Sequence, residues 1–106
     1  MKSSKLLTKA RALIADPKHW TQNCSARNQQ GVAVYSRDDE AFSYCMMAAT
    51  HKVATGPGKI VESQLYLRKA INSSSLSAFN DAPERTHAQV LAAFDKAIVL
   101  ATEAGD

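Results

Sequence analysis

Residues 86–105, THAQVLAAFDKAIVLATEAG, hold the clearest structural signal in the chain. Thr86 is followed three positions later by Gln89, which is the spacing of a capping box, where each side chain bonds the backbone of the other at a helix start. Apolar side chains then recur at the spacing of one helix face: Val90, Leu91, Phe94, Ile98 and Ala101. Gly105 is typical of a helix end. This stretch predicts an amphipathic helix that begins at Thr86 and packs against a core.

A helix is also expected near the start of the chain, at residues 4–16. Its apolar side chains fall on one face by helical spacing: Leu6, Leu7, Ala10, Leu13 and Ile14. Ser3 or Ser4 can cap its first turn. Pro17 ends it, because the residue before a proline is pushed out of the α region.

Two more helices are predicted in the middle of the chain, at residues 40–54 and 59–72. The first would be capped by Asp38 or Asp39 and would end at the Thr-Gly-Pro-Gly stretch of residues 55–58. Its buried face would hold five side chains: Phe42, Cys45, Met46, Ala49 and Val53. The apolar pattern of the second is less regular, which indicates burial on two sides.

The segment between the first and second helices has an extended character. Asn-Gln-Gln-Gly at residues 28–31 is a turn signal, and it predicts a small β-hairpin of roughly 22–27 with 32–35. An isolated two-stranded hairpin is only marginally stable in water, so this hairpin must pack on the helices. Farther along, residues 76–79 are expected to form one helical turn and residues 80–84 a turn.

These elements together predict a mainly α (α+β) fold, with about four helices and one small β-hairpin between the first and second helices. A chain of 106 residues with 45% hydrophobic residues can build one core, so we expect a single helical domain over residues 1–106. No apolar run reaches the roughly 20 residues that cross a bilayer. The start does not continue as a signal peptide, because Lys9, Arg11 and Asp16 interrupt it. We therefore expect no membrane association and a cytoplasmic protein, in a bacterium or in a phage-infected cell.

The net charge is +3, and basic residues gather near the start of the chain: Lys2, Lys5, Lys9, Arg11 and Lys18. Such a stripe could meet nucleic acid or an acidic partner, but basic stripes are common on solvated helix faces. The sequence has no helix-turn-helix spacing, RNP motif or zinc-finger pattern. We therefore do not expect nucleic-acid binding.

Neither a metal site nor a catalytic constellation is predicted. Four residues separate His19 from Cys24 and five separate Cys45 from His51, and neither gap matches a structural zinc site. The chain lacks Gly-x-Ser-x-Gly, a phosphate-binding glycine loop and His-Glu-x-x-His. We expect no cofactor and favour a non-enzymatic protein over an enzyme. A disulfide between the two cysteines stays open, although a cytosolic location argues against it.

The densest polar cluster consists of five candidate ligand-binding residues: Asn80, Asp81, Arg85, Thr86 and His87. A helix N-terminus offers free N–H groups and a partial positive charge, which attract anions. Arg85 would strengthen that attraction, and His87 in the first turn is expected to be neutral. A purely structural interpretation also fits, with Thr86 as a cap, Asn80 and Asp81 in a turn and Arg85 paired with Asp81.

Trp20, Gln22 and Arg27 form a second candidate group. If the hairpin folds over the start of the last helix, both groups would line one concavity suited to an anionic or nucleotide-like ligand. The alternative is that Trp20 seals an edge of the core and that Arg27 points at solvent.

Three segments carry a resemblance to a known family: RALIADPKHWTQ at residues 11–22, SYCMMAA at 43–49 and FNDAPERTHAQVL at 79–91. In this order they resemble a small family of uncharacterised proteins found in bacteria and their phages, catalogued as a domain of unknown function. The most specific part is Asn-Asp-x-x-x-Arg-Thr-His before the last helix. The family usually has Trp-Cys where this chain has Tyr44-Cys45. The resemblance implies a single domain and a bacterial or viral cytoplasm, and it implies no activity.

Two hypotheses for function follow. The first is a small non-enzymatic binding protein, such as a phage-encoded accessory or counter-defence protein that acts on a host protein; an exposed Met at 46 or 47 would suit an adaptable surface. The alternative is a protein that binds a small anionic, nucleotide-like ligand, or an enzyme that uses the helix start at Arg85, Thr86 and His87. The expected partner is therefore a protein or a small anionic ligand, and the sequence does not predict an oligomeric state.

Overall fold

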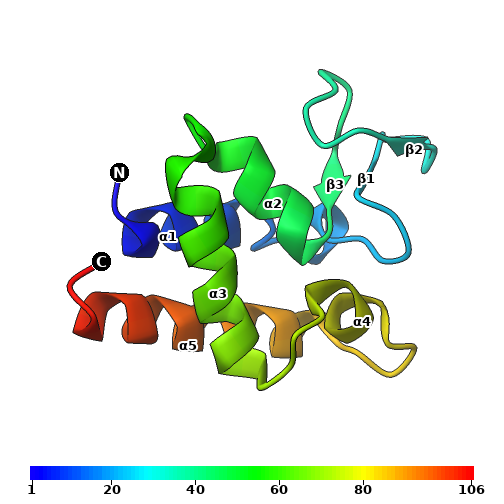
Figure 1. The fold of residues 1–106 in the computed structure, drawn as a ribbon. Helices are drawn as coiled ribbons and strands as arrows, with labels where there is room; N and C mark the ends of the chain where they lie inside the picture. Colours follow the sequence, from blue (N-terminus) through cyan, green and yellow to red (C-terminus); the bar gives the residue numbers. More distant parts are fainter.

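A computed structural model describes all 106 residues as five α-helices, two short 3-10 turns and a small sheet (Figure 1). The helices are α1 (Ser3–Leu13), α2 (Met46–Val53), α3 (Ile60–Ile71), α4 (Leu76–Asp81) and α5 (His87–Glu103). The 3-10 turns are η1 (Pro17–His19) and η2 (Pro57–Lys59), and the strands are β1 (Ala26–Arg27), β2 (Ala33–Val34) and β3 (Ser43–Tyr44). The predicted mainly α fold with a small β element is confirmed, and α4 adds a helix where one turn was expected.

Helix α5 contacts both α1 and α3, and these three helices enclose most of the core (Figure 1). All five helices and the C-cap of α1 contribute the largest fully buried apolar side chains: Leu6, Leu7, Ile14, Met46, Leu67, Leu76, Val90 and Phe94. Each such side chain contributes about 1.5–3 kcal/mol through removal from water. None of the helices combines the length and the hydropathy needed to cross a bilayer.

The capping box at the start of α5 is confirmed. The Thr86 hydroxyl accepts from the Gln89 N–H at 3.2 Å, and the Gln89 side-chain oxygen accepts from the Thr86 N–H at 3.0 Å. Val90, Phe94 and Ala101 are fully buried on its inner face. The helix ends at Glu103, two residues before the predicted glycine stop.

Helix α1 begins as predicted, but neither serine caps it. The N-cap position is Lys2, which offers no capping side chain. The carboxylate of Asp106 accepts from the Ser3 N–H at 3.1 Å and from the Ser3 hydroxyl at 2.8 Å, and the Lys59 ammonium donates to it at 2.9 Å. The hydrogen bonds from Lys59 and from Ser3 lower the pKa of Asp106 to about 2. The first turn of α1 is therefore capped by a side chain from the opposite end of the chain.

The sheet is antiparallel, with the strand order β2-β1-β3. Ala26 pairs with Val34 on one side and with Tyr44 on the other. The predicted hairpin lies where expected, although its strands are only two residues long. The third strand was not predicted. Its outer side is covered by the residues after η1, because the Thr21 N–H donates to the Tyr44 carbonyl at 3.1 Å.

The predicted helix over residues 40–54 is wrong at its start, since α2 begins only at Met46. Pairing with β1 holds Ser43 and Tyr44 extended and buries both of them. Asp38 does not cap a helix; its carboxylate accepts from the Glu40 N–H in a turn. The N-cap is Cys45, whose sulfur accepts from the Ala48 N–H at 3.4 Å. Non-local strand pairing thus overrides a local helical pattern.

The predicted turn at 80–84 also begins too early, because Asn80 and Asp81 are the last two residues of α4. Ser75 caps this helix by accepting from the Ala78 N–H at 3.1 Å. Helix α3 agrees with the predicted range of 59–72 to within one residue at each end. Its C-cap is Asn72, whose φ of 53° is a left-handed conformation that asparagine tolerates.

Candidate functional site

Asn80 is the centre of the polar cluster, and its side chain is 1% exposed. Its Oδ1 accepts from the Trp20 indole at 2.8 Å and from the Met46 N–H at 3.1 Å. Its Nδ2 donates to the Thr21 carbonyl at 3.0 Å and to Asp81 Oδ1 at 2.9 Å. Every donor and both acceptor positions of the amide are therefore used. We call these five residues the Asn80 network.

Gln22 adds a second connection between the same segments. Its amide nitrogen donates to the carbonyls of Asn80 at 2.9 Å and Ala82 at 3.0 Å. The carbonyls of the last turn of a helix have no intrahelical partner, and Ala82, the C-cap of α4, also accepts from the Arg85 N–H at 2.9 Å. Gln22 thus caps the C-terminus of α4 from a loop that lies about 60 residues away in the sequence.

Arg27 on β1 is engaged by three groups of the same loop region. Its guanidinium donates to the Thr21 hydroxyl at 2.9 Å, to the Gly31 carbonyl at 3.0 Å and to the Gln22 carbonyl at 3.2 Å. The expectation that it points at solvent is wrong, because these bonds hold the arginine against the hairpin. Arg27 lines no cavity in the structure.

The structure separates the three residues of the predicted α5 helix start. Arg85 donates from Nε to the Phe79 carbonyl at 2.8 Å and lies 3.6 Å over the Phe79 ring, so it does not pair with Asp81. The ring of His87 donates from Nε2 to the Ile14 carbonyl at 2.7 Å, which requires the proton on that nitrogen. Thr86 serves the capping box.

Trp20 joins the two candidate groups, a meeting that the sequence left open. Its indole bonds Asn80, and its ring centroid lies 6.0 Å from that of His87. The two groups therefore meet around the start of α5 and the end of α4. They meet mainly through hydrogen bonds to one another and to the backbone.

Arg85 lines a shallow groove of about 360 Å³ between α3, α4 and α5. Five apolar side chains form most of its lining: Ala70, Ile71, Phe79, Ala92 and Ala93. Arg85 and Lys96 contribute two positive charges, and no carboxylate lines the groove. We call this feature the α3–α5 groove.

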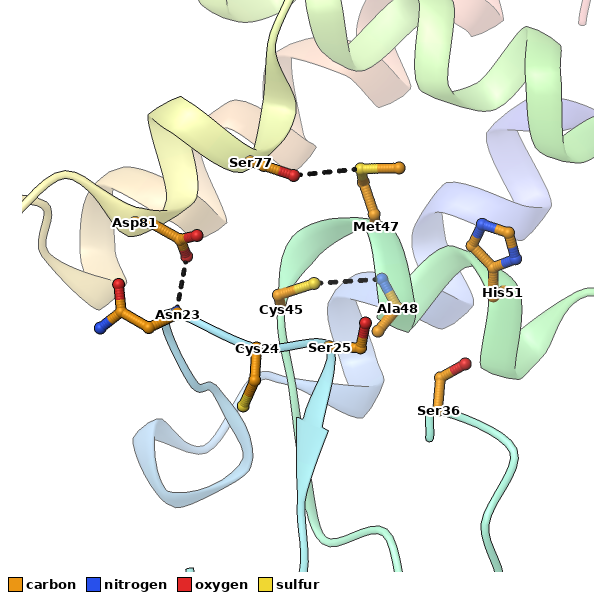
Figure 2. Close-up of a pocket in the computed structure, with 10 residues that line it drawn as sticks. All are labelled: Asn23, Cys24, Ser25, Ser36, Cys45, Met47, Ala48, His51, Ser77 and Asp81. Atoms are coloured by element: carbon orange, nitrogen blue, oxygen red, sulfur yellow. Dashed lines mark hydrogen bonds between the residues drawn. The ribbon is translucent and has the colours of Figure 1, made fainter. Parts of the chain in front are cut away.

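A second cavity, of about 370 Å³, lies between the start of the hairpin, α2 and α4 (Figure 2). Both cysteines, His51 and Asp81 line it, together with serines. Of these residues, only Asp81 belonged to the predicted candidates. We call this feature the α2–α4 cavity.

The two cysteines of the α2–α4 cavity are free thiols. Cys24 donates to the Ala26 carbonyl at 3.4 Å, and Figure 2 shows its sulfur turned away from that of Cys45. Burial raises the pKa of the Cys45 thiol, which favours its neutral form. No group of three or more His, Cys, Asp or Glu residues converges in a way that could hold a metal ion.

The cavity was missed because its lining residues come from four separated stretches, at 23–25, at Ser36, at 45–51 and at 77–81. The predicted helix start at residue 40 also placed Cys45 inside the second helix, whereas it is the N-cap of α2. The one local signal is the pair Cys45 and His51, which lie six positions apart in the sequence, but this spacing matches no metal site and does not by itself indicate a shared cavity.

The chain is thus a small, mainly α protein whose short three-stranded sheet is tied to its helices by the Asn80 network. A family model described as a family of unknown function (DUF6197) matches residues 1–100, so the chain belongs to this family. The expected membership of an uncharacterised family is confirmed. Neither a curated protein nor a solved structure matches the chain.

Proposed function

We propose that the chain is a small non-enzymatic binding protein whose partner is another protein. The observation that carries this proposal is the α3–α5 groove, with its apolar floor and its two cationic residues. Apolar grooves between helices commonly receive the apolar face of an amphipathic helix. The charges of Arg85 and Lys96 favour a segment with acidic side chains beside its apolar face.

Both cations of the groove keep hydrogen-bond donors that no other group of the chain uses, which supports an acidic partner. Lys96 is exposed and makes no ion pair within the chain, so its charge is available to a ligand. Arg85 uses Nε and one terminal nitrogen within the chain, at Phe79 and Gln89, and keeps its second terminal nitrogen free. The guanidinium carbon of Arg85 lies 3.6 Å from the centroid of the Phe79 ring, a cation–π contact that holds the charge at the edge of the groove.

We further propose that the partner is a host protein and that the chain acts in the cytoplasm of a bacterium or a phage-infected cell, as a phage-encoded accessory or counter-defence protein. The resemblance to a family found in bacteria and phages supports this setting. The alternative, a small anionic ligand, would use the same groove cations. The start of α5 gives this alternative less support, because Thr86 and His87 already form hydrogen bonds, to Gln89 and to the Ile14 carbonyl.

The proposal is tested with two synthetic helical peptides that share their apolar positions and differ only in a glutamate or lysine polar face. Fluorescence anisotropy at low salt should detect binding of the glutamate peptide alone. Ala92→Glu places a carboxylate in the groove at an exposed helical position and should weaken binding by about tenfold, or about 1.4 kcal/mol. Ala88→Glu adds the same charge on the same helix outside the groove, so it should leave binding unchanged.

A bacterial lysate extends the test to natural partners. Proteins captured by the wild-type chain should be lost with Ala92→Glu and retained with Ala88→Glu. Equal binding of the glutamate and lysine peptides, or equal capture by both variants, contradicts the proposal. Binding of free nucleotides but of no peptide would instead favour the alternative.

A further inference from the structure

The α2–α4 cavity has the dimensions of a small-molecule site. Its volume of about 370 Å³ lies within the range of about 300–1,000 Å³ that ligand pockets occupy. It shares no lining residue with the α3–α5 groove, so it is a separate feature of the surface. Figure 2 shows its lining side chains arranged around a common space between the hairpin, α2 and α4.

Three polar side chains at this cavity have no partner within the protein. The hydroxyls of Ser25 and Ser36 and the imidazole of His51 make no hydrogen bond in the fold, and Figure 2 marks none from them to the other lining residues. The segment that carries Ser36 is held beside α2, because the Arg37 guanidinium donates to the His51 carbonyl at 2.6 Å and to the Ala54 carbonyl at 3.4 Å. The Arg37 bonds thus hold Ser36 near His51, and the polar groups of both side chains stay available for hydrogen bonding to a ligand.

The cavity carries a negative charge with no positive residue in its lining. Asp81 Oδ1 accepts from the Asn23 N–H at 2.8 Å and from Asn80 Nδ2 at 2.9 Å, which fixes the carboxylate. Its second oxygen has no partner within the chain and is turned toward the cavity (Figure 2). No lysine or arginine lines the space. The Asp81 charge also acts on Cys45, adding to the burial that keeps this thiol protonated.

We propose that the α2–α4 cavity binds a small cationic molecule that carries both an ammonium group and hydroxyl groups, as amino sugars and amino alcohols do. The ammonium donates to the free oxygen of Asp81. The hydroxyls exchange hydrogen bonds with Ser36 and His51 at the other end of the cavity. Phosphate and carboxylate ligands are disfavoured, because they would meet the fixed Asp81 charge with no cation to balance it.

The test compares glucosamine, glucose and gluconate, which share a sugar skeleton and differ in charge. Amide NMR spectra of the full chain are recorded at neutral pH, where most glucosamine is protonated, up to millimolar concentrations. Glucosamine should shift the amides of Ser25, Ser36 and His51, with glucose weaker and gluconate without effect. Asp81→Asn and His51→Leu should each weaken glucosamine binding by about tenfold, or about 1.4 kcal/mol.

Asp39→Asn is the matched control, since it removes the same charge from an exposed residue outside the cavity. It should bind glucosamine as the wild type does. The proposal is overturned if glucosamine shifts no cavity amide, if glucose or gluconate binds as tightly, or if Asp39→Asn weakens binding as much as Asp81→Asn. Should Asp81→Asn unfold, His51→Leu decides, and unchanged binding by that variant overturns the proposal.

Discussion

Replacing Asn80 by alanine should destabilise the protein more than any surface change of similar size. The substitution removes the hydrogen-bond partner of two buried backbone groups: Oδ1, which accepts from the Met46 N–H, and Nδ2, which donates to the Thr21 carbonyl. Each buried group left without a partner costs about 1–3 kcal/mol. The Trp20 indole and Asp81 are partly exposed and can bond water instead. We therefore expect a loss of about 3 kcal/mol in the free energy of unfolding.

A loss of that size is large for a domain of this length. Each kcal/mol corresponds to about 4–8 °C in Tm, so Asn80→Ala should lower Tm by about 15 °C. Circular dichroism during heating and urea titration measure the two quantities independently. Ser77→Ala, an exposed change on the same helix, should stay within about 0.5 kcal/mol of the wild type.

Asn80→Asp separates the loss of hydrogen-bond donors from the loss of volume. An aspartate there has the shape of asparagine, but its ionised form cannot donate to the Thr21 carbonyl and lies next to Asp81. This variant should lose stability as pH rises from about 4 to 7, because the protonated acid can still donate and the carboxylate cannot. A loss below about 1 kcal/mol for Asn80→Ala, or no pH dependence for Asn80→Asp, would refute the structural role of the network.

Three further predictions concern single contacts. Asp106→Asn should lower the free energy of unfolding, measured by urea titration, by about 1 kcal/mol. The lowering of the Asp106 pKa from an ordinary 3.8 to about 2 corresponds to at most about 2.4 kcal/mol, and solvent screening reduces this value. Because that pKa is lowered, wild-type stability should fall as pH drops from about 4 to 2, and Asp106→Asn should show a shallower fall. Thr86→Ala should cost about 1 kcal/mol by removing the cap of α5, whereas Thr102→Ala, exposed on the same helix, should cost much less. Burial raises the pKa of Cys45, so in a Cys24→Ser background iodoacetamide should label the folded protein at pH 8 more slowly than the urea-unfolded one; equal rates would contradict this.

The last helix could be predicted because its signals are local. The capping box joins Thr86 to Gln89, and the apolar stripe repeats within one segment. Strand β3 could not, because nothing within Ser43–Tyr44 distinguishes an edge strand from the first turn of a helix. Its conformation depends on pairing with Ala26 and Arg27, which lie 16 or more positions earlier. Local patterns therefore predicted four helices, but they misplaced the start of the second and extended the first to residue 16, three residues beyond its end at Leu13.

In the candidate site, too, the residues could be predicted from local sequence, but their long-range contacts could not. The sequence placed Trp20 and Gln22 in one polar group and Asn80 in another, and the structure brings the two groups together. The sequence did not identify their partners, since most of those contacts join residues 58–60 positions apart. It also missed Ser36 and His51, because neither residue stands in a motif and their relation depends on how the hairpin meets α2.

The contact between Asp106 and the first turn of α1 has a consequence for the connectivity of the protein. Three hydrogen bonds join Asp106 to Ser3 and Ser4, so the two ends of the chain lie side by side. A short glycine-serine linker could join Asp106 to Met1, and new ends could be opened in the exposed segment 55–58 between α2 and α3. Such a circular permutant would keep every helix contact while reversing which segment is synthesised first. It would show whether the order of synthesis affects how the helices and the sheet assemble.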